Sequence, residues 1–211
     1  SASGTSGNFL QSIRIGSPAV PNNNSISNWR IGISANKIIG LNIDNNSISS
    51  NYAGIYVARC SNLKINNNMI RQFRTGIHCY DNSGNIEINT NYFNYPITPD
   101  VIKNTAIRVE NPSSNSIDLR IESNWIFNAT TGILCRNVPK AIVGKRNRIY
   151  FFADNSTLTT LGFNEAISLE NCNDSYVLLN EVYRYIDPDP SMPEIMRGIS
   201  IDKTTNAYVY G

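Results

Sequence analysis

The hydrophobic and polar positions of this chain form blocks of short alternating runs. In the block from residue 54 to residue 70, Ile55 and Val57 are the apolar positions of the first run. Leu63 and Ile65 are the apolar positions of the second, and a third run begins where the block ends. Alternation over runs this short predicts β-strands rather than helices.

The block recurs along the whole chain. Its copies open at seven positions, which are Gly32, Gly54, Gly76, Ala106, Gly132, Ala166 and Gly198. Because the turn sequences typical of β-hairpins are absent between the runs, each copy must pair with the next in parallel, at about 4.8 Å per step. The pattern therefore predicts an all-β solenoid of about seven rungs, each burying its apolar side against its neighbours.

Equivalent positions of the copies form columns along this solenoid. One polar column consists of Asn46, Asn68, Asn91, Asn124, Asn147 and Asn180. We predict that these amides form a hydrogen-bonded ladder, at a turn where Asn tolerates left-handed backbone angles. One apolar column is expected to contain Ile43, Ile65, Ile88, Ile121, Val177 and Val209, and to be broken at Gly144.

The combined pattern of Gly-Ile-x-Val, Leu-x-Ile-x-x-Asn and Ile resembles that of the right-handed parallel β-helix superfamily, over residues 30–211. This superfamily includes pectate lyases, polygalacturonases, alginate epimerases and phage tailspikes. The resemblance implies a right-handed, single-stranded parallel β-helix, and it is specific for the fold rather than for a function. The polygalacturonase motifs are absent, so no catalytic residue is transferred from that family.

Length and composition limit the other possibilities. The 211 residues suffice for one domain with a substantial core. Residues 1–8 are predicted to be a flexible linker and residues 9–211 the β-helix domain, which is expected to be a fragment of a longer chain. The net charge is only +2 and no basic run occurs, so we expect no nucleic-acid partner. No apolar span is long enough for a membrane helix, so no membrane partner is expected.

The cysteines are predicted to be buried free thiols. Cys79 and Cys135 occupy one column two rungs apart, and Cys60 and Cys172 occupy another column four rungs apart. These separations of about 10 Å and about 19 Å exceed the reach of a disulfide. Because the chain has neither a Cys-x-x-Cys motif nor a histidine cluster, we predict no metal site and no cofactor.

A candidate binding surface follows the outward positions of the first run. Its members are Tyr56, His78, Tyr80, Arg108, Glu110 and Arg136, with Phe152 and Tyr185 added from insertions. The insertions, at residues 94–105, 150–164 and 183–196, all precede a first run and are expected to emerge along one edge. Aromatic faces beside planar hydrogen-bonding groups suit sugar rings. An ordinary solvated surface is the alternative interpretation.

Two carboxylates on this surface are candidates for catalysis. Glu170 and Asp202 fall on adjacent rungs, about 5 Å apart at Cα, and glycoside hydrolysis requires a pair of carboxylates at close range. The alternative is that they form structural ion pairs with Arg108, Arg136 and Lys203.

Taken together, these features favour extracellular carbohydrate recognition by a tailspike-like or adhesin-like protein, with a polysaccharide or surface glycan as its partner. One alternative is a polysaccharide lyase, glycoside hydrolase or epimerase of the same superfamily. Another is a structural spacer in a virion or surface fibre. The expected location is extracellular, on a cell surface or on a virion, and the sequence leaves open whether the parent protein is a homotrimer.

Overall fold

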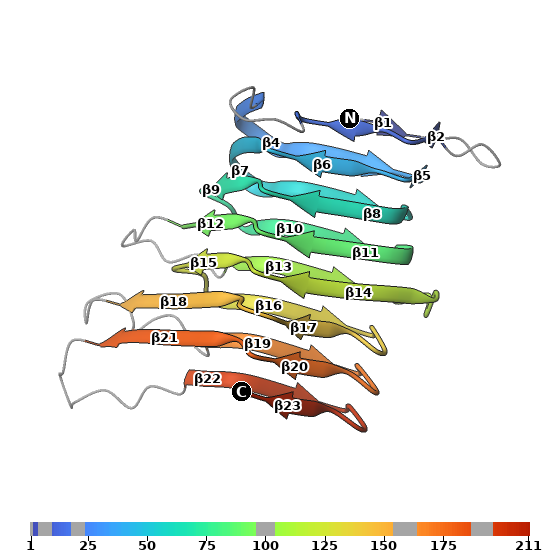
Figure 1. Cartoon of the computed structure of the whole chain (residues 1–211). Helices are drawn as coiled ribbons and strands as arrows, with labels where there is room; N and C mark the ends of the chain where they lie inside the picture. The colour runs from blue at the N-terminus through green and yellow to red at the C-terminus, as the bar shows by residue number, and fades with distance from the viewer. Residues whose placement is uncertain (1, 4–9, 18–23, 96–103, 154–163, 187–195) are drawn as a thin grey trace.

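The computed structural model describes residues 2–3, 10–17, 24–95, 104–153, 164–186 and 196–211. Within these ranges the chain forms strands and no helix. All of the strand pairings are parallel, and each turn of the chain stacks on the one before it, from the N-terminus at the top of Figure 1 to the C-terminus at the bottom. The protein is thus a single-stranded parallel β-helix, as the alternating runs predict.

The first strands of the turns correspond to the openings of the seven sequence copies. They are β4 (Asn24–Asn36), β7 (Asn46–Ala58), β10 (Thr75–Tyr80), β13 (Thr105–Glu110), β16 (Thr131–Arg136), β19 (Asn164–Glu170) and β22 (Met196–Asp202). Strands β4 and β7 are long because each also contains the third strand of the turn before it.

The second strands form a separate sheet. They are β5 (Ile38–Ile39), β6 (Asn42–Asp44), β8 (Ser61–Asn66), β11 (Ser83–Asn89), β14 (Ile117–Glu122), β17 (Ile142–Gly144), β20 (Tyr176–Leu178) and β23 (Tyr208–Tyr210). The remaining third strands are β9 (Met69–Arg71), β12 (Tyr92–Asn94), β15 (Trp125–Phe127), β18 (Arg148–Ala153) and β21 (Glu181–Ile186).

Three short strands precede the first sequence copy. Strands β1 (Ala2–Ser3), β2 (Leu10–Gln11) and β3 (Arg14–Ile15) pair with β4, β5 and β6. They add a partial turn to the coil. Strand β1 lies within the segment 1–8 for which we predict a linker, so these two residues are part of the β-helix; residues 1 and 4–9 lie outside the described residues.

The core consists of stacked apolar columns, and the register corrects one of our assignments. Ile121 pairs with Val143, and Val143 pairs with Val177, so the column is continuous and the predicted break at Gly144 is wrong. The reason is an extra residue in the corner that follows. Lys145 and Arg146 both have positive φ there, of 48° and 73°, so counting back three positions from the next ladder asparagine leads to Gly144 instead of Val143.

The asparagine ladder is confirmed. Each side-chain amide donates to the Oδ1 of the next asparagine along the column, over distances of 2.9–3.1 Å from Asn46 to Asn180. Asn24 extends the ladder by one member, because its Nδ2 donates to Asn46 Oδ1 at 3.0 Å. The left-handed position is not the ladder residue itself but the residue before it, such as Asn67 with φ of 56° and Ser123 with φ of 57°.

The glycine that opens most copies has a steric role. A Cβ at Gly54 would lie 2.5 Å from Ile70 Cγ2 and 2.7 Å from the carbonyl oxygen of Gly76. Successive turns therefore approach each other so closely at this corner that a side chain would have to displace a neighbour.

The four cysteines are buried and free, as predicted. Cys79 and Cys135 share an inward column and are separated by Val109 of the turn between them. Burial raises the pKa of each of the four thiols, so they behave as small apolar side chains of the core.

Candidate functional site

The outward positions of the first strands form two parallel rows, as the sequence pattern predicts. In one row His78 pairs with Tyr56 on one side and Arg108 on the other. In the second row the register connects Tyr80, Glu110, Arg136, Glu170 and Asp202. These two rows constitute the candidate site, and we call the surface they cover the first-strand face.

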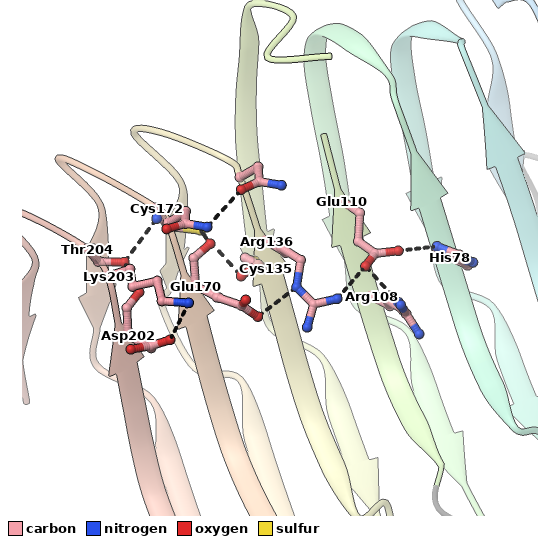
Figure 2. A network of polar contacts seen from close by, with 12 residues as sticks. His78, Arg108, Glu110, Cys135, Arg136, Glu170, Cys172, Asp202, Lys203 and Thr204 are labelled. Carbon is pink, nitrogen blue, oxygen red and sulfur yellow. Dashed lines mark hydrogen bonds and ion pairs between the residues drawn. The ribbon is translucent and has the colours of Figure 1, made fainter. Parts of the chain in front are cut away.

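Glu110 is the centre of the polar contacts on this face (Figure 2). Its Oε1 accepts hydrogen bonds from Arg108 Nη2 at 2.8 Å and from Arg136 Nη1 at 2.9 Å. Its Oε2 lies 3.1 Å from His78 Nε2. Burial by itself raises the pKa of Glu110, but the hydrogen bond and charge of Arg108, followed by those of His78, bring it below its usual value. The carboxylate is therefore ionised at neutral pH and fixes three neighbouring side chains.

His78 is held in a defined tautomer by this carboxylate. Burial lowers the pKa of His78, and the hydrogen bond to Glu110 only partly compensates. The imidazole is thus neutral at pH 7. Because an ionised carboxylate can only accept, Nε2 carries the proton and Nδ1 is the acceptor nitrogen.

The rings around His78 pack edge to face. The ring centroids of Tyr56 and His78 lie 5.3 Å apart, and those of His78 and Tyr80 lie 6.1 Å apart. T-shaped packing of this kind directs the edge of one ring at the face of another and restrains both. Arg108 lies on the turn next to this cluster and Arg136 lies one turn further on, so apolar ring surface and guanidinium donors occur on the same first-strand face.

The two candidate catalytic carboxylates occupy adjacent rungs but have different partners. Glu170 Oε2 accepts from Arg136 Nε at 2.6 Å, whereas Asp202 Oδ2 lies 3.9 Å from Lys203 Nζ. Figure 2 shows the two carboxylates directed toward these separate cations. The ion pairs are those of the structural alternative, and a catalytic role for Glu170 and Asp202 stays a prediction.

The remaining two predicted contact residues come from a different part of the turn. Phe152 and Tyr185 pair with each other at Cα in β18 and β21, which are third strands. Their side chains lie outside the described part of the structure, as do residues 96–103, 154–163 and 187–195, which make up most of the three insertions. The predicted position of the insertions along one edge is therefore not tested.

One group of surface residues was missed by the sequence reasoning. The outward positions of the third strands carry Tyr92, Trp125, Phe127, Tyr150 and Tyr183, on four consecutive turns. The sequence contained a signal for this group, at the two positions that flank each inward residue of the third strands. These inward residues are Phe93, Ile126, Ile149 and Val182. Each of these inward residues is directly preceded or followed in the sequence by an aromatic residue, which faces outward because strand positions alternate.

Among the residues that the structure describes, no three of His, Cys, Asp and Glu lie close enough to hold a metal ion. The thiols are buried with raised pKa values, whereas metals are bound by thiolates. Within the same part of the chain, no helix is long and apolar enough to span a membrane.

Comparison with known proteins supports the fold and leaves the chemistry open. The family model described as periplasmic copper-binding protein (NosD) matches residues 2–100, just under half of the chain. No curated protein and no solved structure matches the chain significantly. Among the described residues, no group of three His, Cys, Asp and Glu side chains is placed to hold the copper that this description names. The parallel coil and the asparagine ladder are those of a parallel β-helix, and the family match over residues 2–100 is consistent with the right-handed parallel β-helix superfamily that the sequence pattern resembles.

Proposed function

We propose that this protein recognises a carbohydrate through its first-strand face. The observation that carries the proposal is the position of Arg108 on the turn next to the edge-to-face cluster of Tyr56, His78 and Tyr80, with Arg136 one turn further on and held by the same carboxylate, Glu110. A sugar ring has an apolar face and a rim of hydroxyl groups, so it needs apolar contact and directed hydrogen bonds from the same small area.

The polar part of the site is organised before any ligand binds. Glu110 accepts from one Nη of each arginine, and Arg136 Nε donates to Glu170. The fixed fork of Arg donates two parallel hydrogen bonds to planar acceptors, so acidic sugars are favoured ligands. Because the side chains are already held in place, binding orders few of them, which lowers its entropic cost.

The location follows from the same comparison. The matching family is described as periplasmic, which supports a compartment outside the cytoplasm. Within that range we propose a surface-exposed tailspike-like or adhesin-like role, and the alternative role of structural spacer predicts a first-strand face that binds no glycan.

An enzymatic function is the second candidate, and one observation favours it. Glu170 and Asp202 are direct Cα partners in the register of β19 and β22, and a retaining glycoside hydrolase requires two carboxyl groups about 5 Å apart. On this hypothesis Glu170→Gln abolishes turnover of a polysaccharide and leaves its binding unchanged. Binding without any product, in the wild-type protein, would reject the enzymatic candidate and leave carbohydrate recognition intact.

The test of recognition is a glycan array followed by calorimetric titration of the best ligand. Arg108→Ala and Tyr80→Ala should weaken binding by about 2 kcal/mol or more, as central contact residues do. Matched controls are Lys64→Ala and Arg120→Ala. These residues lie on the outward side of the second strands, which we call the second-strand face, and they are cations that also have acidic partners. If the controls weaken binding as much as the site variants, or if no glycan binds, the proposal is wrong.

A further inference from the structure

The outward side of the third strands carries a second organised surface, which is separate from the first-strand face. We call it the third-strand face. Its rings stack along the axis of the coil: Phe127 and Tyr150 have centroids 4.8 Å apart at an interplanar angle of 4°, and Tyr150 and Tyr183 are 4.9 Å apart at 8°. Tyr92, which pairs with Trp125 in the register, also contacts this row from the N-terminal side, with its ring 5.2 Å from that of Phe127 at a tilted angle of 39°. The row extends over three steps between turns, or about 14 Å.

Polar contacts fix the orientation of the side chains at the C-terminal half of this row. The guanidinium of Arg148 lies over the Trp125 ring, 4.9 Å from its centroid. Arg148 Nε donates to Glu181 Oε2 at 3.0 Å, and the Tyr183 hydroxyl donates to the same oxygen at 2.9 Å. Four side chains on three successive turns are therefore connected, from Trp125 to Tyr183.

Two of these aromatic side chains are exposed to solvent. Trp125 is 41% exposed although its strand β15 pairs on both sides, and Tyr183 is 46% exposed on β21, the edge strand of the sheet. Stacking along the axis accounts for the alignment of Phe127 and Tyr150, but it does not require a large indole at the surface. Clustered apolar surface of this kind, with polar groups at its border, is typical of binding sites.

The charge of the surface indicates which ligand suits it. Arg148 and Glu181 neutralise each other, and the pKa of Glu181 is lowered by the hydrogen bonds from Tyr183 and Arg148, so the pair stays ionised at neutral pH. The surface between Trp125 and Tyr183 thus combines aromatic rings, a hydroxyl and a neutral ion pair. It differs from the first-strand face, where two arginines surround Glu110.

We infer that the third-strand face is a second binding surface, which takes an uncharged polysaccharide segment lying along the axis of the coil across Trp125 and Tyr183. The ligand class rests on the proposed carbohydrate recognition, but the residues are entirely different. An elongated ligand is favoured because the fixed side chains follow one line across consecutive turns. A neutral sugar is favoured because the surface offers no unbalanced charge among these residues.

Tryptophan fluorescence tests this inference directly. The chain has two tryptophans, and Trp29→Phe leaves Trp125 as the only one; Trp29 is the more exposed of the two and lies in β4. This single-tryptophan protein is titrated with three uncharged hexasaccharides, of β-1,4-, β-1,3- and α-1,4-linked glucose, and with a hexamer of galacturonic acid. At least one neutral hexasaccharide should change the emission in a saturable manner, and the acidic hexamer should not.

The chain provides a matched pair of tyrosines for the control. Tyr183 stacks on Tyr150 at 4.9 Å, and Tyr208 on the second-strand face stacks on Tyr176 at 5.0 Å and is 41% exposed. Tyr183→Ala should weaken the neutral hexasaccharide at least tenfold, and Tyr208→Ala should leave its affinity unchanged. Equal effects of the two variants would overturn the inference, because the losses would then reflect the end of a ring stack rather than ligand contact.

The remaining outcomes separate this inference from the proposed function. If no neutral hexasaccharide changes the Trp125 emission while a glycan still binds in an Arg108-dependent manner, the second surface is refuted and the first-strand face stands. If the Trp125 emission responds while Arg108→Ala and Tyr80→Ala bind all glycans normally, the second surface is supported and the proposed first-strand site is refuted.

Discussion

Removing the side chain of Asn124 tests the physical basis of the β-helix. Asn124 is fully buried, and its Nδ2 donates to Asn147 Oδ1, to the Ile88 carbonyl and to the Glu122 carbonyl. Its Oδ1 accepts from the backbone N–H and the side-chain amide of Asn91. The substitution Asn124→Ala therefore removes five hydrogen bonds from the interior of the ladder.

The size of the loss follows from the groups left behind. The Asn91 amide side chain keeps its bond to the Ile65 carbonyl, and Asn147 Oδ1 still accepts from the Asn124 backbone N–H. The Asn91 backbone N–H loses its acceptor and the Ile88 carbonyl loses a donor. An unsatisfied buried group costs about 1–3 kcal/mol, so we expect Asn124→Ala to lower the free energy of unfolding by about 2–4 kcal/mol.

A graded series distinguishes the ladder from a general effect of Asn→Ala. Asn180, at the C-terminal end, is only half-buried; it accepts from Asn147 and donates to the Val143 carbonyl, so Asn180→Ala should cost less. Asn85 is exposed and its amide contacts only the Glu87 side chain, so Asn85→Ala should be nearly neutral. Urea unfolding followed by circular dichroism should give midpoints in that order. Equal midpoints for Asn124→Ala and Asn85→Ala would refute the reasoning.

Three further predictions concern the corner glycine, the thiols and the central carboxylate. Gly54→Ala should destabilise by about 1–3 kcal/mol through overpacking, whereas Gly198→Ala, which has open space around its Cβ, should not; similar urea midpoints would contradict the close approach of the turns. Thiol titration under non-reducing conditions should detect four thiols after denaturation and almost none in the folded protein, because all four are buried and free. Since burial raises their pKa values, the unfolded chain releases protons above about pH 8.5 while the folded chain does not, and urea midpoints should fall as the pH rises beyond that value. Glu110→Gln should destabilise by about 1–3 kcal/mol at pH 7, discounted for partly exposed partners. Because the pKa of Glu110 is lowered, its contribution is present above about pH 4.3 and lost as the pH falls further, so a gap from wild type that is unchanged at pH 3 would be inconsistent with the ion pairs.

Much of the fold was contained in the sequence. Alternation with a period of two determines which side chains face inward in a strand, and the repeat places equivalent residues of successive copies above one another. The two rules together predicted the inward columns, the asparagine ladder and the row from Tyr80 to Asp202, all of which the register confirms. The free state of the cysteines followed from the same arithmetic.

The local errors have two causes. An extra residue at a corner is absorbed by backbone angles, as at Lys145 and Arg146, and a pattern that assumes fixed spacing then shifts a neighbouring position from one face to the other. The left-handed angle was assigned to the ladder asparagine because Asn tolerates such angles, although the residue before it adopts that angle.

The contacts of the surface were decided by the tertiary structure. The sequence placed Glu110, Arg136 and Glu170 on one row, but the choice of partners depends on side-chain reach and burial across the turns. The aromatic row ending at Tyr183 escaped notice because its members are far apart in the chain and flank an unremarkable apolar column. A repeat determines the rung and the face of each residue, whereas the partner of an outward side chain is selected only when the turns stack and long side chains settle into the conformations that satisfy their charges and ring contacts.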